Sequence, residues 1–232
     1  CIRDRSMRYG IPNIEAVNHL FIFLMATVLS ISSCVKPPEE IIQPDFTIDD
    51  STGIKKYGKL VVLNEGLFQQ NNSTISQINL SDSTVMNGVY QSINQRKLGD
   101  TGNDMQVYGD KIYVVLHSSS YVEVLDKYSL QFVGRVELLD GNKSRLPRYV
   151  AFYENEVWVS CYDGNVISFD TTSFTINSII KIGRNPEGLA VTGDKLFIAN
   201  SGGLDTPNYD KTVSVVDLIT RTETKKIEVG IN

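Results

Sequence analysis

The chain has 232 residues, of which 41% are hydrophobic and 21% charged, and this composition is that of a globular protein with a sizeable core. Its formal net charge is -5, and no more than two Lys or Arg residues are adjacent. A nucleic-acid surface needs a basic stripe, so the sequence excludes nucleic acid as a partner.

The chain opens with a predicted signal peptide at residues 1–34. Met7 is the expected initiator, Arg8 supplies a short positive region, and the apolar run Leu20–Leu29 is too short to span a bilayer, which takes ~20 residues. Small residues precede Cys34 in "SISSC", which resembles a bacterial lipobox. We therefore expect a lipidated Cys34 that anchors the protein to a membrane, the alternative being an ordinary cleavage site with an incidental cysteine.

A flexible tether is expected at residues 35–56, which are polar and contain Pro37, Pro38 and Pro44. Its first part, "KPPEE", resembles the export signals of Bacteroidetes surface lipoproteins. This resemblance implies an outer-membrane location at the cell surface. Beyond Cys34, the only later cysteine is Cys161, so we expect no disulfide and interpret Cys161 as a small buried side chain.

Residues 57–232 contain a loose internal repeat. The runs "KIYVV", "EVWVS" and "KLFIA" are spaced by 45 and 39 residues, and Asp126, Asp170 and Asp217 end later apolar runs at spacings of 44 and 47. Units of this length with four short apolar runs are typical of β-propeller blades. We predict an all-β fold, a β-propeller with four visible blades at about 57–97, 98–144, 145–184 and 185–232.

Each unit combines four predicted strands with characteristic turns. In the last unit the strands are "GLAV", "KLFIAN", "TVSVVD" and "KKIEVG". The "GDK" stretches at Gly109 and Gly193 predict hairpin turns between the first two strands. The aspartates that end the third strands predict Asx turns into the fourth strands.

The stretches "NPEGLAVTGDKLFIANSG" and "TVSVVDLITRTETKKIEVG" resemble the YVTN-type repeat of YncE-like and surface-layer-like propellers. The resemblance implies seven blades, and we therefore expect the four visible ones to be part of a truncated ring. More narrowly, "VLNEGLF", "KLGDTGNDM" and "LPRYVAF" resemble lipidated Bacteroidetes propellers, some of which capture cobalamin beside an outer-membrane transporter. This resemblance assigns no ligand residue.

Irregular segments are expected on one face of such a propeller, formed by the loops between second and third strands and by the blade connections. Loops that vary on a rigid scaffold commonly carry function. Aromatic side chains there could stack on a planar ligand, and charged ones could pair with its polar edge. The candidate ligand-binding residues are Glu65, Phe68, Asn103, Asp104, His117, Tyr121, Arg145, Arg148, Tyr162, Arg184, Glu187, Asn200 and Tyr209.

Metal and cofactor chemistry finds little support in the sequence. Asp205, Asn208 and Asp210 carry oxygens that suit calcium, but their spacing is not that of an EF-hand, and a flexible turn-rich loop is the favoured interpretation. His117 and Cys161 make neither a zinc site nor a convincing Cys-His pair. We therefore expect no metal ion and no cofactor.

The sequence favours a protein that is not an enzyme, because it contains neither a G-x-S-x-G elbow nor a P-loop. We expect a lipid-anchored surface propeller that binds a small ligand, with a corrinoid as the candidate, and that works with a TonB-dependent outer-membrane transporter. The alternative is an envelope scaffold for protein–protein interaction. A calcium-dependent lactonase, with Glu65, Asn103 and Asn200 as conceivable ligands, and a quinone-dependent dehydrogenase rank below both.

Overall fold

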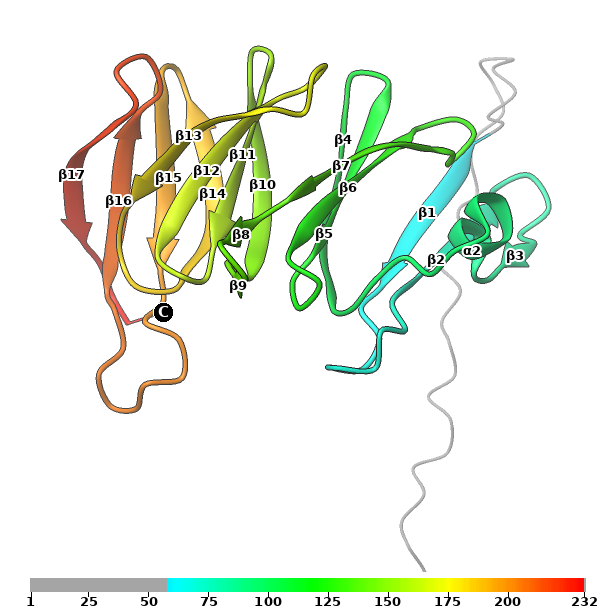
Figure 1. Ribbon diagram of the computed structural model, residues 1–232, viewed down its shortest axis with the longest axis horizontal. Helices are drawn as coiled ribbons and strands as arrows, with labels where there is room; N and C mark the ends of the chain where they lie inside the picture. Colours follow the sequence, from blue (N-terminus) through cyan, green and yellow to red (C-terminus); the bar gives the residue numbers. More distant parts are fainter. Residues whose placement is uncertain (1–57, 232) are drawn as a thin grey trace, which may run out of the picture. The chain divides into compact units, whose positions relative to one another are not determined.

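The computed structural model describes residues 58–231, so the predicted signal peptide, Cys34 and the tether lie outside the described residues. The described part is all-β, as predicted, and contains four antiparallel sheets, one two-stranded ribbon and one short helix (Figure 1). Within this part of the chain, no helix is both long and apolar enough to span a membrane.

The first sheet has three strands and the next three sheets have four each. The strands of the first sheet are β1 (Lys59–Asn64), β2 (Thr74–Asn79) and β3 (Val85–Met86). Those of the second are β4 (Gly102–Tyr108), β5 (Lys111–Leu116), β6 (Tyr121–Asp126) and β7 (Phe132–Glu137). The third contains β10 (Pro147–Tyr153), β11 (Glu156–Cys161), β12 (Asn165–Asp170) and β13 (Ile176–Lys181), and the fourth β14 (Pro186–Thr192), β15 (Lys195–Asn200), β16 (Thr212–Asp217) and β17 (Thr222–Glu228).

In every sheet the strands lie in chain order, each antiparallel to the next. Short turns between consecutive strands produce this arrangement, because antiparallel neighbours need only a hairpin. The predicted second and third strands of the last unit, "KLFIAN" and "TVSVVD", coincide with β15 and β16. The alternating apolar pattern therefore located these strands correctly.

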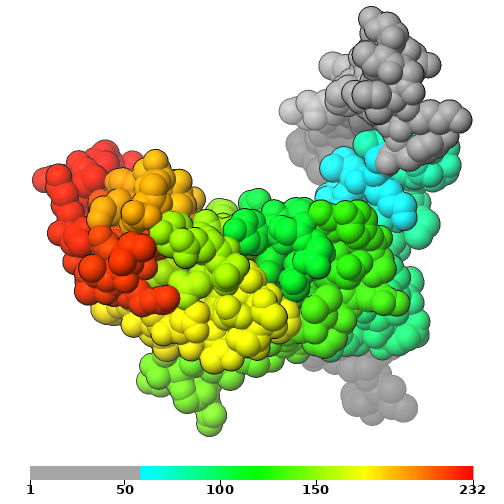
Figure 2. Space-filling model, turned by 90° about the horizontal axis from the view of Figure 1, so that it is seen from above, coloured from blue at the N-terminus to red at the C-terminus, as the bar shows by residue number. Residues whose placement is uncertain are grey.

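The sheets stand side by side in chain order and pack face to face (Figures 1 and 2). Because successive side chains of a strand point to opposite faces, β5 contributes to two cores. Its Ile112 and Val114 join the core shared with the first sheet, whereas Tyr113 and Val115 join the core shared with the third. A further core, which includes Trp158 of β11, joins the third and fourth sheets.

The first strands of successive sheets lie next to each other, since β10 contacts both β4 and β14. The last strands β13 and β17 are also in contact. Among the described residues β1 pairs with β2 alone, and no sheet closes on itself. The described part is therefore a row of stacked sheets with their first strands on the same side.

One end of the sheets, here called the turn end, carries the predicted turns. Gly109 and Gly193 have φ of +62° and +52°, which suits glycine in a two-residue hairpin. Asp126 Oδ1 accepts hydrogen bonds from the backbone N–H groups of Tyr128 and Ser129 at 3.1 and 2.7 Å. Asp170 and Asp217 each accept the same pair of bonds from the residues two and three positions on. The predicted Asx turns are confirmed.

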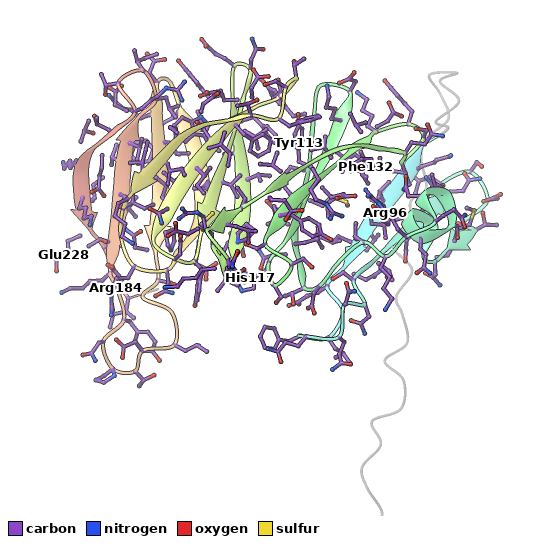
Figure 3. The ribbon with its side chains drawn as sticks, in the orientation of Figure 1. Arg96, Tyr113, His117, Phe132, Arg184 and Glu228 are labelled. Atoms are coloured by element: carbon purple, nitrogen blue, oxygen red, sulfur yellow. The ribbon has the colours of Figure 1, made fainter. Side chains whose placement is uncertain are left out.

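Helix α2 (Val89–Asn94), which packs on β2, was not predicted from the sequence. The Tyr90 hydroxyl of this helix donates to the fully buried carboxylate of Glu123, which also pairs with Arg96 and, at 2.7 Å, with Arg135. The Arg96 guanidinium lies 3.9 Å from the centre of the Phe132 ring, and Figure 3 shows the two side chains together. Contacts between distant segments, rather than a side-chain cap, thus hold α2 in place.

The ribbon of β8 (Leu139–Asp140) and β9 (Lys143–Ser144), which lies in the connection between the second and third sheets, was also not predicted. Arg145, immediately after β9, is only 8% exposed. Its guanidinium pairs with Asp163 at 2.7 Å and lies 3.5 Å from Asp140. This double ion pair fastens the ribbon to the β11–β12 turn.

Candidate ligand-binding site

The end of the sheets opposite the turn end, here called the loop end, collects the irregular segments. It comprises the β1–β2 loop of the first sheet, the turns between second and third strands of the other three sheets, and the connections from one sheet to the next. In Figure 1 these segments lie along the lower edge of the sheets. The segments are 65–73, 95–101, 117–120, 138–146, 162–164, 182–185 and 201–211.

Three equivalent positions on the first strands project from this end. Asn103, Arg148 and Glu187 each follow the first residue of β4, β10 or β14, where the register shifts relative to the second strand. Such a bulge re-aims a side chain away from the regular alternation of the strand. Asn103 Nδ2 donates to the Arg148 carbonyl oxygen, and Arg148 Nε donates to Glu187 Oε2 at 2.7 Å. These three residues, one from each of three sheets, thus form a row that hydrogen bonds connect.

Two aromatic rings adjoin this row. His117 follows β5 and Tyr162 follows β11, so they occupy equivalent positions in neighbouring sheets. Their ring centres are 5.9 Å apart in an edge-to-face contact, and the Arg148 guanidinium lies 5.5 Å from the centre of the Tyr162 ring. We call Asn103, His117, Arg148, Tyr162 and Glu187 the central group; Figure 3 shows His117 at the lower ends of the strands.

The His117 imidazole is neutral at neutral pH because burial lowers its pKa below the usual 6.5. Its Nδ1 lies 3.1 Å from the Pro147 carbonyl oxygen, which can only accept, so Nδ1 carries the proton. Nε2 of this tautomer is then a hydrogen-bond acceptor. The central group therefore offers one cation, one carboxylate, two aromatic faces and a neutral acceptor.

Three predicted site residues are buried and hold the fold instead. Tyr121 was expected to be exposed, but it is 8% exposed, and its hydroxyl donates to the Leu98 carbonyl oxygen at 2.7 Å. Asn200 is fully buried, with Nδ2 donating to Thr212 Oγ1 at 3.0 Å and Ser214 Oγ at 2.9 Å. Arg145 is held by the double ion pair described above. For these residues the expectation of a ligand-facing side chain is wrong.

Asp104 also has a structural role. Its Oδ2 accepts a hydrogen bond from the Val150 backbone N–H at 3.0 Å, which ties β4 to β10. Its Oδ1 accepts from the Met105 backbone N–H at 2.9 Å. The carboxylate therefore joins two sheets beneath the central group.

Arg184 is occupied by the long loop at 201–211. Its Nη1 pairs with Asp205 at 2.9 Å and its Nη2 donates to the Asn208 carbonyl oxygen. Asp210 accepts hydrogen bonds from the backbone N–H groups of Lys211 and Thr212. The three oxygen-bearing residues considered for calcium are thus engaged within the loop, and residues 58–231 hold no group of three or more His, Cys, Asp or Glu side chains placed to bind a metal ion.

The remaining candidates lie on the two projecting loops. Glu65 and Phe68 are exposed in the first, with Phe68 at 64%. Tyr209 is 38% exposed in the second, where its hydroxyl is 2.7 Å from Thr206 Oγ1. None of the described contacts joins these side chains to the central group.

Sequence reasoning missed two residues that shape the loop end. Asp163 and Asp140 hold Arg145, and neither was among the candidates. Asp163 lies 18 positions from Arg145, and no local pattern marks a pair over that distance.

A cavity of about 640 Å³ opens at the turn end between the first and second sheets. Leu60, Val61, Val107 and Ile112 give it an apolar wall, which Lys59 and Lys127 border. It lies far from the central group, at the end where the repeated turns are found. We place the candidate site at the loop end because polar and aromatic groups from several sheets converge there.

The fold is similar to that of two solved structures at low sequence identity. Hydrazine synthase of Kuenenia stuttgartiensis matches with a TM-score of 0.54 and 14% identity, over 68% of this chain and 44% of that one. The computationally designed Ika8 protein matches with a TM-score of 0.52 and 13% identity, over 72% and 48%. The chain thus spans less than half the length of either structure, and at this identity the likeness shows the fold alone.

Comparison with curated proteins gives no significant match. Residues 57–232, which include every described residue, match the family described as a domain of unknown function, DUF5074. The match covers more than half of the sequence. The chain therefore belongs to the DUF5074 family.

Proposed function

We propose that the four sheets are part of a β-propeller whose loop end binds a small ligand without catalysing a reaction. The consecutive strand order, the face-to-face packing and the adjacent first strands support the propeller. Phe197 of β15 supports it further, because it occupies the position of Tyr113 in β5 and Trp158 in β11, which the next sheet buries completely. A propeller would place another sheet against this half-buried side chain.

The observation that carries the ligand-binding proposal is the central group itself. At the turn end, the three Asx aspartates repeat one residue at one position of three sheets. At the loop end, the equivalent bulge positions carry Asn103, Arg148 and Glu187. The fold does not dictate these side chains, because three different ones satisfy the same backbone position. Their convergence beside two aromatic rings suits a binding site.

We propose a corrinoid as the ligand and an outer-membrane transporter as the partner, with Cys34 lipidated at the cell surface. The support is the resemblance to lipidated propellers in "VLNEGLF", "KLGDTGNDM" and "LPRYVAF". The central group fits a large ligand with a flat face and polar edges, because Tyr162 offers a ring for stacking. The Arg148–Glu187 pair, with side chains 24% and 23% exposed, offers charges that can exchange partners with the ligand.

The test is a titration of the full chain with cyanocobalamin, followed by calorimetry and visible absorbance. We expect measurable heat and an absorbance shift. Arg148→Gln and Tyr162→Ala should each weaken binding by about tenfold or more, because each removes a contact at the centre of the site. Lys211→Gln is the matched control, since it removes an ion pair of 2.6 Å with Glu228 at the outer edge of the fourth sheet.

Two results would contradict the proposal. Absence of both heat and absorbance shift with the unmodified protein would remove the corrinoid. Binding that survives both central substitutions unchanged, or that Lys211→Gln weakens equally, would remove the central group as the site.

A protein-binding scaffold is the second candidate, and exposed apolar side chains on the two loops favour it. Leu67 and Phe68 are 67% and 64% exposed, and Leu204 is 95% exposed. Large exposed apolar groups mark interaction sites when they cluster. Cross-linking from a photoreactive group at position 68 should capture an envelope protein if this candidate is correct, and capture of no protein would count against it.

A further inference from the structure

A second cavity lies at the loop end, between the third and fourth sheets. Its volume is about 260 Å³, well above the ~30 Å³ of one water molecule in the liquid. Tyr162, a member of the central group, also lines this cavity. The charged side chains in its wall are Asp163, Lys181, Arg184, Asp210 and Lys226.

The two lysines come from strands that face each other. Lys181 ends β13 and Lys226 lies in β17, and these strands are in contact. Lys226 pairs in register with Ser214, which is fully buried against the third sheet, so Lys226 points to that side. The fold therefore brings two ammonium groups to one opening.

Both ammonium groups keep hydrogen-bond donors to spare. Lys181 Nζ donates to the Asp163 carbonyl oxygen at 2.9 Å, and an ammonium has three donors. Lys226 Nζ forms an ion pair with Glu223 Oε1 at 3.8 Å, a separation beyond hydrogen-bond distance that leaves its donors unfilled. A Cβ at Gly164 would lie 2.6 Å from Lys181 Nζ, so this glycine leaves the space that the ammonium occupies.

The carboxylates in the wall are already occupied by internal donors. Asp163 Oδ1 accepts from the Asn165 backbone N–H, and its Oδ2 accepts from Arg145. Asp210 Oδ1 accepts from the Thr212 backbone N–H and hydroxyl, and its Oδ2 accepts from the Arg184 backbone N–H at 3.4 Å. The two carboxylates in the wall thus have internal donors, whereas both ammonium groups keep unfilled ones, and that arrangement favours a ligand rich in acceptor oxygens.

We propose that this cavity binds an oxyanion, either inorganic phosphate or the phosphate or carboxylate group of a larger ligand. Lys181 and Lys226 hold the anion from opposite strands through charge-assisted hydrogen bonds. The Arg184 guanidinium, engaged by Asp205, adds positive charge at the rim. The site shares Tyr162 with the central group, but its charged residues are not members of that group and its binding requires no corrinoid.

The experiment titrates the full chain with inorganic phosphate at low ionic strength and follows binding by calorimetry and by ³¹P line broadening. We expect saturable binding that Lys181→Ala and Lys226→Ala each weaken by about tenfold. Lys225→Ala is the matched control, because Lys225 is adjacent in β17 but pairs with Val215 and points to the opposite face. Thermal unfolding of each variant checks that the sheets remain folded.

Acetate and phosphoserine titrations separate the sources of the oxyanion. Stronger binding of acetate than of phosphate would assign a carboxylate, and competition by phosphoserine would assign a phosphate carried by a larger ligand. Phosphate binding that is absent, or that Lys225→Ala reduces as much as Lys226→Ala, would overturn the proposal. Because no corrinoid is present, this result is independent of the cyanocobalamin titration.

Discussion

The two ends of the sheets differ in how far equivalent positions share the same residue. At the turn end, Asp126, Asp170 and Asp217 occupy one position in three sheets and make the same pair of backbone hydrogen bonds. At the loop end, His117 and Tyr162 occupy one position in two sheets, and they differ in size and in the polar group that they carry. Repetition indicates a requirement of the fold, whereas variation leaves a position free for another role.

Burial limits this comparison, because some residues that vary between repeats are internal. Glu123 is fully buried, and its equivalents Ser76, Ile167 and Ser214 are uncharged. Asn200 is fully buried as well, and Asn64 alone repeats it. Variation indicates function only where the side chain also reaches the surface.

The largest effect is expected for Glu123→Ala. The substitution removes the buried partner of two partly exposed arginines, Arg96 and Arg135, and the acceptor of the Tyr90 hydroxyl. Loss of one partner from a buried ion network costs about 3 kcal/mol. Urea unfolding should show this loss, with Glu123→Gln intermediate because it keeps a hydrogen-bond acceptor.

Ligand affinity provides the control for this variant. Glu123 lies on β6, away from the central group, so cyanocobalamin binding by the folded variant should be unchanged. A stable Glu123→Ala protein that has lost ligand binding would show that a varying residue can be functional without reaching the surface.

Asn200→Ala should have the next largest effect. The side chain bonds Thr212 and Ser214 across the sheet, and Asn64 makes the same two contacts with Thr74 and Ser76. Removing a buried partner of two hydroxyls costs about 1–3 kcal/mol in unfolding free energy, without a change in ligand affinity. The matched variant Asn64→Ala should lose a similar amount, and weaker ligand binding by Asn200→Ala would return this residue to the site.

The strands were predictable from the sequence because their apolar residues alternate and their turns are local. β15 and β16 begin and end where "KLFIAN" and "TVSVVD" do, since Gly193 and Asp217 fix the flanking turns within a few residues. Helix α2 was not predictable, because it depends on Tyr90 reaching Glu123, 33 positions away.

Within the candidate site, the sequence located the loop end but not the exposure of its residues. Arg148 and Glu187 were found because both lie near the beginning of a first strand. The burial of Arg145 depends on Asp163 and the unpredicted β8–β9 ribbon. Tyr121 is buried because its hydroxyl reaches the Leu98 carbonyl oxygen, 23 positions earlier, and no local pattern marks that contact.

A smaller effect is expected when the turn-end aspartates lose their charge. Hydrogen bonds from the backbone N–H groups of Ser129 and Ser173 lower the pKa of Asp126 and Asp170 below 3.8. Because the pKa is lower in the folded state than in the unfolded state, the charged aspartates contribute their full stabilisation above the unfolded-state pKa. This contribution is lost as the pH falls through the folded-state pKa. Asp126→Asn/Asp170→Asn should therefore melt slightly lower than the parent at neutral pH.

The difference in melting temperature between the parent and the Asp126→Asn/Asp170→Asn variant should shrink as the pH falls from about 4 to about 2. Circular dichroism at a series of pH values measures it. A difference that stays constant, or grows, on acidification would show that the turns do not depend on the carboxylate charge. Cyanocobalamin affinity at neutral pH serves as the control and should be unaffected.

The smallest effect on stability is expected for the Arg148–Glu187 pair. Both side chains are partly exposed, and such pairs contribute about 0–1 kcal/mol. A double-mutant cycle with Arg148→Gln and Glu187→Gln, followed by urea unfolding, should give a coupling energy within that range, while the same variants weaken ligand binding. A coupling well above it would mean that the pair holds β10 to β14, in which case the loop end would be built for stability in the same way as the turn end.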